Sequence, residues 1–316
     1  MPTRSRQTRL ERVSPGNSVL LLVDQQEGLL GRCKDCDGSG LRDGHWTDSE
    51  YSLGLADCPK CQGEGWVRLY RDVHVIQLGD LAHVGGSTGS ETGDILCYKY
   101  VTKNRWVDVV LWGNHDRALV DPQHEFRGYR YNPSLLHYIT QLHEEGRLMM
   151  VIDAHGFLIS HAGLADHFKQ QKVDEKYKTD LEAFVDWIND KDEEYLIGQM
   201  DPRTPHVDKD KVDWQAIGVI NAIGHRRGGA SPVGGLLWRD IEESLYSGFR
   251  QIFGHSADNK EGKVRYCDRT TNTRKADVAP ENPSYCIDVG GKRGDGHHAL
   301  AGIWLPSEKI VRVDLD

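Results

Sequence analysis

Five polar residues in this chain each stand at the end of a short apolar run and could bind a metal ion. The runs are "SVLLLVD", "VHVIQLGD", "VVLWGNHD", "GFLISHAG" and "FRQIFGHS", and the residues are Asp24, Asp80, Asn114, His161 and His255. Carboxylate, amide and imidazole groups together suit Mn, Fe, Zn or Ni ions. Each residue alone has a structural alternative, because an Asp can cap a helix, an Asn can form a turn and a lone His often belongs to a core. The fivefold recurrence of the pattern favours one metal site built from strand ends.

Four of the seven cysteines form a second candidate metal site. Cys33 and Cys36 lie in "CKDCDGSG", and Cys58 and Cys61 lie in "CPKCQGEG", two copies of one Cys-x-x-Cys-x-Gly-x-Gly pattern. The pattern resembles the zinc-binding repeats of DnaJ-type chaperones, in which two thiolates from each copy would complete one structural zinc site. A thioredoxin-like redox motif fits less well, since one copy would suffice. We expect residues 31–66 to form an inserted four-cysteine zinc module, either a structural staple or a recognition arm beside Asp24.

The elements that would position these residues alternate along the chain. The five apolar runs are rich in Val, Ile, Leu or Phe and are bounded by turn-forming residues, as strands are. Residues 132–146 and 178–196 show helical periodicity, and the second segment opens with a capping box of Thr179 and Glu182. The alternation of strands and helices predicts a layered α/β architecture with ligands at the strand ends.

Four of these motifs, taken in order, carry a resemblance to a known family. "QLGDL", "LWGNHDR", "LISHAGL" and "FGHSA" resemble the calcineurin-like metallophosphoesterase superfamily, in the branch of phosphoprotein phosphatases and diadenosine tetraphosphatases. "GGLLWRD" and the closing "YCIDVGGKRGDGHHALAGIWL" are similar to segments of the same branch. The resemblance implies a β-sandwich flanked by helices in α/β/β/α layers, over residues 14–316. Residues 31–66 would be a small zinc-ribbon-like insertion, and residues 1–13 a basic tail.

The resemblance also implies a dinuclear centre for hydrolysis of a phosphate ester or phosphoanhydride by a metal-bound hydroxide. Asp80 would bridge the two divalent ions (Mn, Fe, Zn or Ni), because its motif position is that of the bridging acid. Asn114, His161 and His255 would complete one site. Asp24 would belong to the other, with Gln26 in the place of the family's second ligand.

The remaining catalytic roles follow from the same motifs. His115 would donate a proton to the leaving oxygen. Asp116 would either orient His115 or form a salt bridge with Arg117. Arg239 is the first candidate for a cation that binds the phosphate, followed by Arg117 and Arg226.

Three positions depart from the family pattern. Gln26 replaces a histidine ligand, His83 replaces the acid that would support the catalytic histidine, and Val84 replaces a phosphate-binding arginine. These departures favour a divergent phosphoesterase over a strict Ser/Thr phosphoprotein phosphatase. They also keep a rival open, a catalytically weakened binding protein that uses its zinc module to recognise a protein or a nucleic acid.

Composition limits the compartment and the partners. The chain has 316 residues, 38% hydrophobic and 28% charged, with a net charge of −9. This composition predicts a globular protein, and the net charge gives no support to broad nucleic-acid binding. No apolar stretch approaches the roughly 18 residues of a membrane span, and paired cysteines in an odd total favour metal binding inside the cell. We expect a cytoplasmic protein, without a membrane partner, that acts on a phosphorylated small molecule, a nucleotide or a phosphoprotein.

Overall fold

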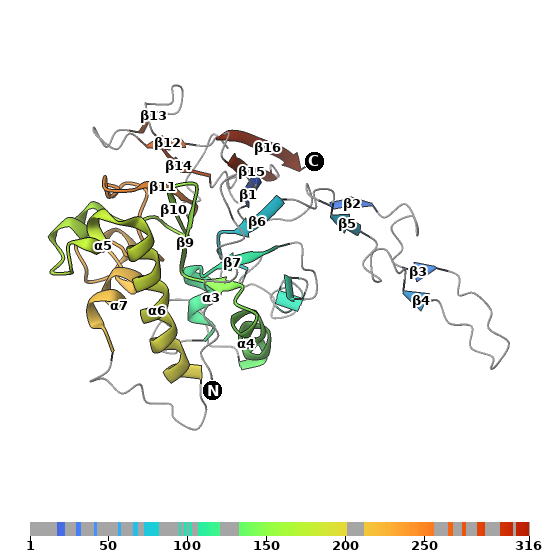
Figure 1. The fold of residues 1–316 in the computed structure, drawn as a ribbon, viewed down its shortest axis with the longest axis horizontal. Helices are drawn as coiled ribbons and strands as arrows, with labels where there is room; N and C mark the ends of the chain where they lie inside the picture. The colour runs from blue at the N-terminus through green and yellow to red at the C-terminus, as the bar shows by residue number, and fades with distance from the viewer. Residues whose placement is uncertain are drawn as a thin grey trace. The chain divides into compact units, whose positions relative to one another are not determined.

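The computed structural model describes this chain in segments that belong to two compact units. The segments are residues 18–22, 30–32, 41–42, 56–57, 66–68, 73–81, 95, 98–99, 101–102, 107–120, 133–200, 212–255, 265–267, 274–275, 283–287, 298–305 and 308–315. The first unit comprises Met1–Asp24 with His74–Asp316, and the second comprises Gln25–Val73. Figure 1 labels most of the helices and strands of both units.

The first unit contains two six-stranded sheets. The first sheet has the order β16 (Lys309–Leu315), β15 (His298–Leu305), β1 (Ser18–Leu22), β6 (Val73–Gln77), β7 (Val109–Leu111) and β8 (Leu148–Met149). Strands β6, β7 and β8 run parallel, whereas β1, β15 and β16 pair antiparallel. The sheet is therefore mixed, with its parallel part at the β8 side.

The second sheet repeats this arrangement. It has the order β13 (Arg274–Lys275), β12 (Arg265–Cys267), β14 (Ser284–Cys286), β11 (Arg250–Phe253), β10 (Phe157–Ser160) and β9 (Val151–Ala154). Strands β10, β11 and β14 run parallel, and β9, β12 and β13 add antiparallel pairs. Each sheet thus has parallel neighbouring strands whose carboxyl ends lie at one edge.

One hydrophobic core joins the two sheets. Ile76 and Leu111 of the first sheet are fully buried in the same cluster as Ile159 and Ile252 of the second, and Ile303 of β15 completes it. Two sheets that share a core in this way form a sandwich, because each buries the apolar face of the other. The predicted α/β class and paired sheets are confirmed.

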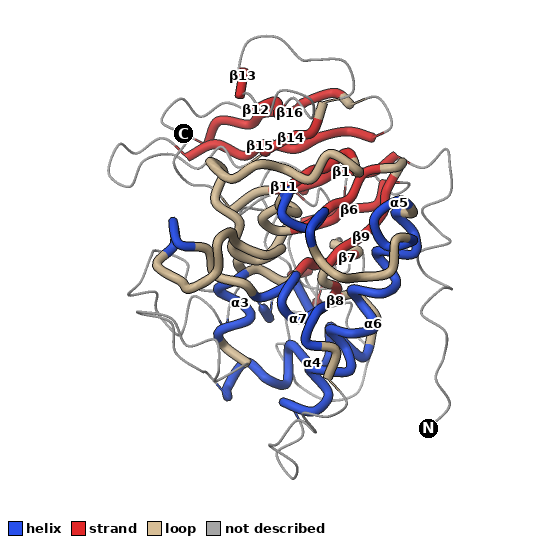
Figure 2. The backbone as a smooth tube through the Cα atoms, turned by 90° about the vertical axis from the view of Figure 1, so that its left-hand side faces the viewer, coloured by secondary structure: helices blue, strands red, loops and turns tan. Residues whose placement is uncertain are grey.

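Helices pack at the β8 and β9 side of the sheets, where Figure 2 shows α4, α6 and α7 together. The helical segments are α3 (Asn114–Ala118), η3 (Pro133–Leu135), α4 (Leu136–Glu144), η4 (Asp166–Gln170), α5 (Lys176–Thr179), α6 (Leu181–Met200), α7 (Trp214–Asn221) and η5 (His225–Arg227). Asn189 of α6 holds the second sheet directly, since its Oδ1 accepts the Met150 and Val151 amides at 2.9 and 3.2 Å. No helix among these described segments has both the length and the apolar character needed to cross a membrane.

Both predicted helical segments are helical, but the second begins differently than expected. The Thr179 hydroxyl, in the last residue of α5, donates to the carbonyl of Glu175, the residue before α5. Asp180 caps α6, because its carboxylate accepts the Ala183 amide at 3.1 Å. The predicted capping box of Thr179 and Glu182 is therefore wrong by one residue, and the reason is the separate turn α5, which occupies Thr179.

The second unit contains two short antiparallel ladders. Strand β2 (Leu30–Arg32) pairs with β5 (Trp66–Arg68), and β3 (Leu41–Arg42) pairs with β4 (Ala56–Asp57). The predicted module, residues 31–66, falls within this unit. Its four cysteines, Cys33, Cys36, Cys58 and Cys61, lie outside the described residues, as does the basic tail. The structural zinc site therefore stays a prediction.

Candidate metal centre

Four predicted ligands meet at the carboxyl ends of parallel strands. Asp80 follows β6 and Asn114 follows β7, which are parallel neighbours in the first sheet. His161 follows β10 and His255 follows β11, which are parallel neighbours in the second sheet. The shared core therefore places two strand ends of each sheet around one point.

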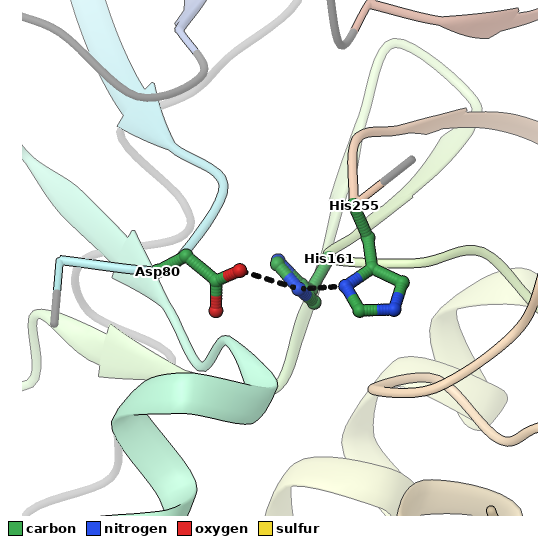
Figure 3. Close-up of side chains that lie close together, drawn as sticks. All are labelled: Asp80, His161 and His255. Atoms are coloured by element: carbon green, nitrogen blue, oxygen red, sulfur yellow. Dashed lines mark hydrogen bonds and ion pairs between the residues drawn. The ribbon is translucent and has the colours of Figure 1, made fainter. Parts of the chain in front are cut away.

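The ligand atoms lie within contact distance of one another (Figure 3). His161 Nε2 is 3.4 Å from Asp80 Oδ2, 2.9 Å from Asn114 Oδ1 and 2.8 Å from His255 Nδ1. The ligand atoms of Asp80, His161 and His255 all fall within 4.8 Å of one another. Of the four residues, Asn114 and His161 are buried and Asp80 and His255 are partly exposed.

With one proton on each imidazole, the cluster has more lone pairs than protons. His161 Nδ1 lies 2.7 Å from the Leu78 carbonyl oxygen, which can only accept, so this nitrogen carries the proton. In a neutral ring, Nε2 would then present a lone pair to the acceptor oxygens of Asp80 and Asn114. Only His255 Nδ1 could donate within this group. A cation at this point would satisfy all four atoms at once, and the donor set fits a divalent metal ion.

His255 is held in the form that binds metals. Burial, followed by the nearby His161, Arg227, His115 and Arg239, lowers the pKa of His255 well below its ordinary value. The ring is therefore neutral at neutral pH, as an imidazole ligand must be. Its Nε2 is buried without a hydrogen-bond partner in the described part of the chain.

Two of the ligands have left-handed backbones, an uncommon conformation for non-glycine residues. Asp80 has φ 60° and His255 has φ 70°. Such strain costs about 1–3 kcal/mol per residue and concentrates at functional sites. Two glycines make room for the Asp80 turn. A Cβ on Gly79 would lie 2.5 Å from the Gly113 nitrogen, and a Cβ on Gly113 would overlap the Asp80 carboxylate.

His115 lies at the rim of the cluster. It is the second residue of α3, and its side chain is 21% exposed. Its Nε2 lies 4.0 Å from Asp80 Oδ2, and its backbone amide donates to Asp80 Oδ1 at 3.1 Å. The imidazole is thus next to the ligands and also reachable from solvent.

Asp116 contacts the backbone behind the ligands. Its Oδ2 accepts the amides of Asp80 at 2.6 Å and Gly113 at 3.0 Å, and its Oδ1 accepts the Tyr98 hydroxyl at 2.8 Å. Burial, and then the charge of Asp80, raise the pKa of Asp116 above its ordinary value. Tyr98 was not singled out from the sequence, because no motif or spacing links it to the strand ends.

The three candidate phosphate-binding arginines have different surroundings. Arg117 is fully buried and pairs with Asp192 of α6 at 2.8 Å. Arg239 is 1% exposed, and its guanidinium donates to the carbonyls of Ala162, Asp240 and Glu243 and lies over the Phe253 ring. Its Nη2 is buried without a hydrogen-bond partner in the described part of the chain, and the contact of Arg239 with phosphate stays a prediction. Arg226 is exposed in η5.

The predicted ligands of the second metal ion, Asp24 and Gln26, lie outside the described residues. So do His83 and Val84. The strand that precedes Asp24, β1, is the neighbour of β6 in the first sheet. The roles of Asp24 and Gln26 stay predictions.

Comparisons with known proteins give no family. No family model and no curated protein matches the chain. Among solved structures, the chain is similar to a cold-active protein-tyrosine phosphatase of a psychrophile, Shewanella sp., with 12% sequence identity and a TM-score of 0.44. The alignment covers 95% of this chain and 80% of that phosphatase. A metallophosphoesterase from Sphaerobacter thermophilus aligns with 12% identity over 95% of this chain and 88% of that chain, with a TM-score of 0.36. A protein serine/threonine phosphatase from Saccharomyces cerevisiae aligns with 11% identity over 100% and 90%, with a TM-score of 0.36. None of these likenesses assigns an activity to the chain.

Proposed function

We propose that this protein is a metal-dependent hydrolase of phosphate esters or phosphoanhydrides with a dinuclear site. The observation that carries the proposal is the convergence of Asp80, Asn114, His161 and His255 beside the solvent-accessible His115. The order of the motifs that contain these residues, which resembles that of metallophosphoesterases, supports the same reaction class.

The four clustered residues would hold one divalent ion, and Asp80 would share a second ion with Asp24 and Gln26. When bound, such ions neutralise phosphate charge and acidify a water molecule. The left-handed backbones of Asp80 and His255, which surrounding contacts must hold, would orient these side chains before any ion binds. This preorganisation is typical of sites that stabilise charge.

His115 would protonate the leaving oxygen. An imidazole both takes and releases a proton near neutral pH, and a general acid must reach the substrate. His115 Nε2 lies 4.0 Å from Asp80 Oδ2, so the ring is beside the cluster and would not itself be a ligand. The substrate would be a phosphorylated small molecule, a nucleotide or a phosphoprotein, and the four-cysteine module would hold one structural zinc ion.

Hydrolysis of p-nitrophenyl phosphate and of its bis-ester, with added manganese, tests this function. His115→Ala is expected to abolish the turnover shown by the wild-type protein, and His137→Ala, an exposed histidine of α4, is the matched control. The preferred ester separates a monoesterase from a diesterase. Absence of turnover with every divalent metal, in protein that holds one zinc per chain, would favour the binding-protein alternative.

A further inference from the structure

A chain of buried hydrogen bonds lies directly behind Asp80. The Asp80 amide, whose residue has φ 60°, donates to Asp116 Oδ2 at 2.6 Å. The same oxygen accepts the Gly113 amide at 3.0 Å. One carboxylate oxygen therefore joins the segment after β6 to the segment after β7, at the point where both deliver their ligands.

The other oxygen of Asp116 has an aromatic partner. Tyr98 donates its hydroxyl to Asp116 Oδ1 at 2.8 Å, and both side chains are buried, with 1% and 2% exposure. A hydrogen bond to a carboxylate is stronger than one between neutral groups, and burial excludes water as a competing partner. Tyr98 therefore limits the rotation of the Asp116 carboxylate.

Tyr98 is itself tied to the first sheet. Its carbonyl accepts the Thr102 hydroxyl at 2.8 Å. Arg147, immediately before β8, donates Nη2 to the carbonyls of Val101 and Val107 at 2.7 and 2.8 Å. Because Arg147 is 1% exposed, this anchor is also inside the protein.

The direction of the Asp80 carboxylate depends on its backbone. Oδ1 accepts the His115 amide at 3.1 Å, and this contact turns Oδ2 toward His161 Nε2 at 3.4 Å. If Asp80 relaxed from its left-handed conformation, Oδ2 would leave the cluster. The strained conformation persists only while surrounding contacts hold it.

We infer that Asp116 and Tyr98 are positioning residues that hold Asp80 in the conformation in which its carboxylate faces the metal ligands. This assigns to Asp116 the support of the Asp80 backbone. The inference rests on the proposed function in one respect, the role of Asp80 as a ligand. Partners that orient a ligand without touching the metal commonly change metal affinity by about 10- to 100-fold.

Tyr98→Phe is the sharpest variant, because it removes one hydroxyl and changes no charge. Asp116→Asn is a second variant that weakens the acceptor of both backbone amides. Tyr285→Phe is the matched control, since the Tyr285 hydroxyl also donates to a carboxylate, that of Glu308, at 2.6 Å, and the ring is 4% exposed. All three proteins are compared with wild type as full-length chains.

Two measurements separate the inference from the proposed function. In metal-free protein, hydrogen exchange of the peptide that contains Asp80 is expected to be about 10-fold faster in Tyr98→Phe and Asp116→Asn, and unchanged in Tyr285→Phe. Manganese titration is expected to show affinity reduced by about 10- to 100-fold in the same two variants only. Unchanged exchange and affinity in both variants would overturn the inference. Wild-type protein that binds no manganese would contradict the proposed function, whereas the exchange measurement would still test the support of the Asp80 backbone.

Discussion

The buried ion pair between Arg117 and Asp192 gives the strongest stability prediction. Arg117 Nη2 and Asp192 Oδ1 are 2.8 Å apart, and the two side chains are 0% and 5% exposed. Their contact is not aligned as a hydrogen bond. Trp112 and Tyr195 face the guanidinium at 5.4 and 5.3 Å and add cation–π attraction. Asp192→Ala would leave the Arg117 charge buried without its counter-ion, and breaking such a pair costs about 3–5 kcal/mol.

Urea unfolding of metal-free protein, followed by tryptophan fluorescence, measures this cost from the midpoint and the slope. We expect the lower half of the range, because the aromatic faces remain. A double variant, Arg117→Met with Asp192→Leu, removes both charges and should recover most of the loss. A cost for Asp192→Ala below about 1 kcal/mol, typical of exposed pairs, would refute the reasoning, since it would mean that water reaches the pair.

Three further predictions follow from particular contacts. Gly113→Ala should abolish manganese binding, because the added Cβ would overlap the Asp80 carboxylate. Gly218→Ala in α7 is the control, since a Cβ there meets nothing within 4 Å, and this variant should bind manganese normally. Manganese titration of both variants measures the difference. Asn189→Leu should lower the free energy of unfolding by about 2–4 kcal/mol, because the buried Met150 and Val151 amides lose their acceptor. Urea unfolding measures this loss. Burial alone would raise the pKa of Glu308, but hydrogen bonds from Arg250 and Tyr285 outweigh it and lower that pKa below 4.5. The stability from this carboxylate is therefore present above pH 4.5 and is lost as the pH falls through the lower folded value, so Glu308→Gln should flatten the acid limb of a stability–pH curve.

Local chemistry explains why the sequence alone predicted the four residues that converge. Asp80, Asn114, His161 and His255 each follow an apolar run and stand beside turn-forming residues, and this pattern is readable within a few residues of chain. Parallel strands then bring such ends to one edge. The α/β class was readable for the same reason, because strand and helix periodicities are local.

The sequence did not show which residues pair inside the protein around the cluster, because the tertiary structure decides those contacts. Arg117 and Asp192 are far apart in the sequence, as are Tyr98 and Asp116, and no local pattern selects one buried carboxylate among many. Arg239 illustrates the same limit, since its motif does not show that its guanidinium donates to the carbonyls of Ala162, Asp240 and Glu243.

The sequence by itself determined which residue types stand at the strand ends, because turn chemistry and hydrophobic periodicity act over a few residues. Only the tertiary structure decided which of the charged groups near them face the site and which support it. The physical reason is that a buried charge takes whichever partner the packing of distant elements brings within reach, and leaving it unpaired costs too much free energy to be tolerated.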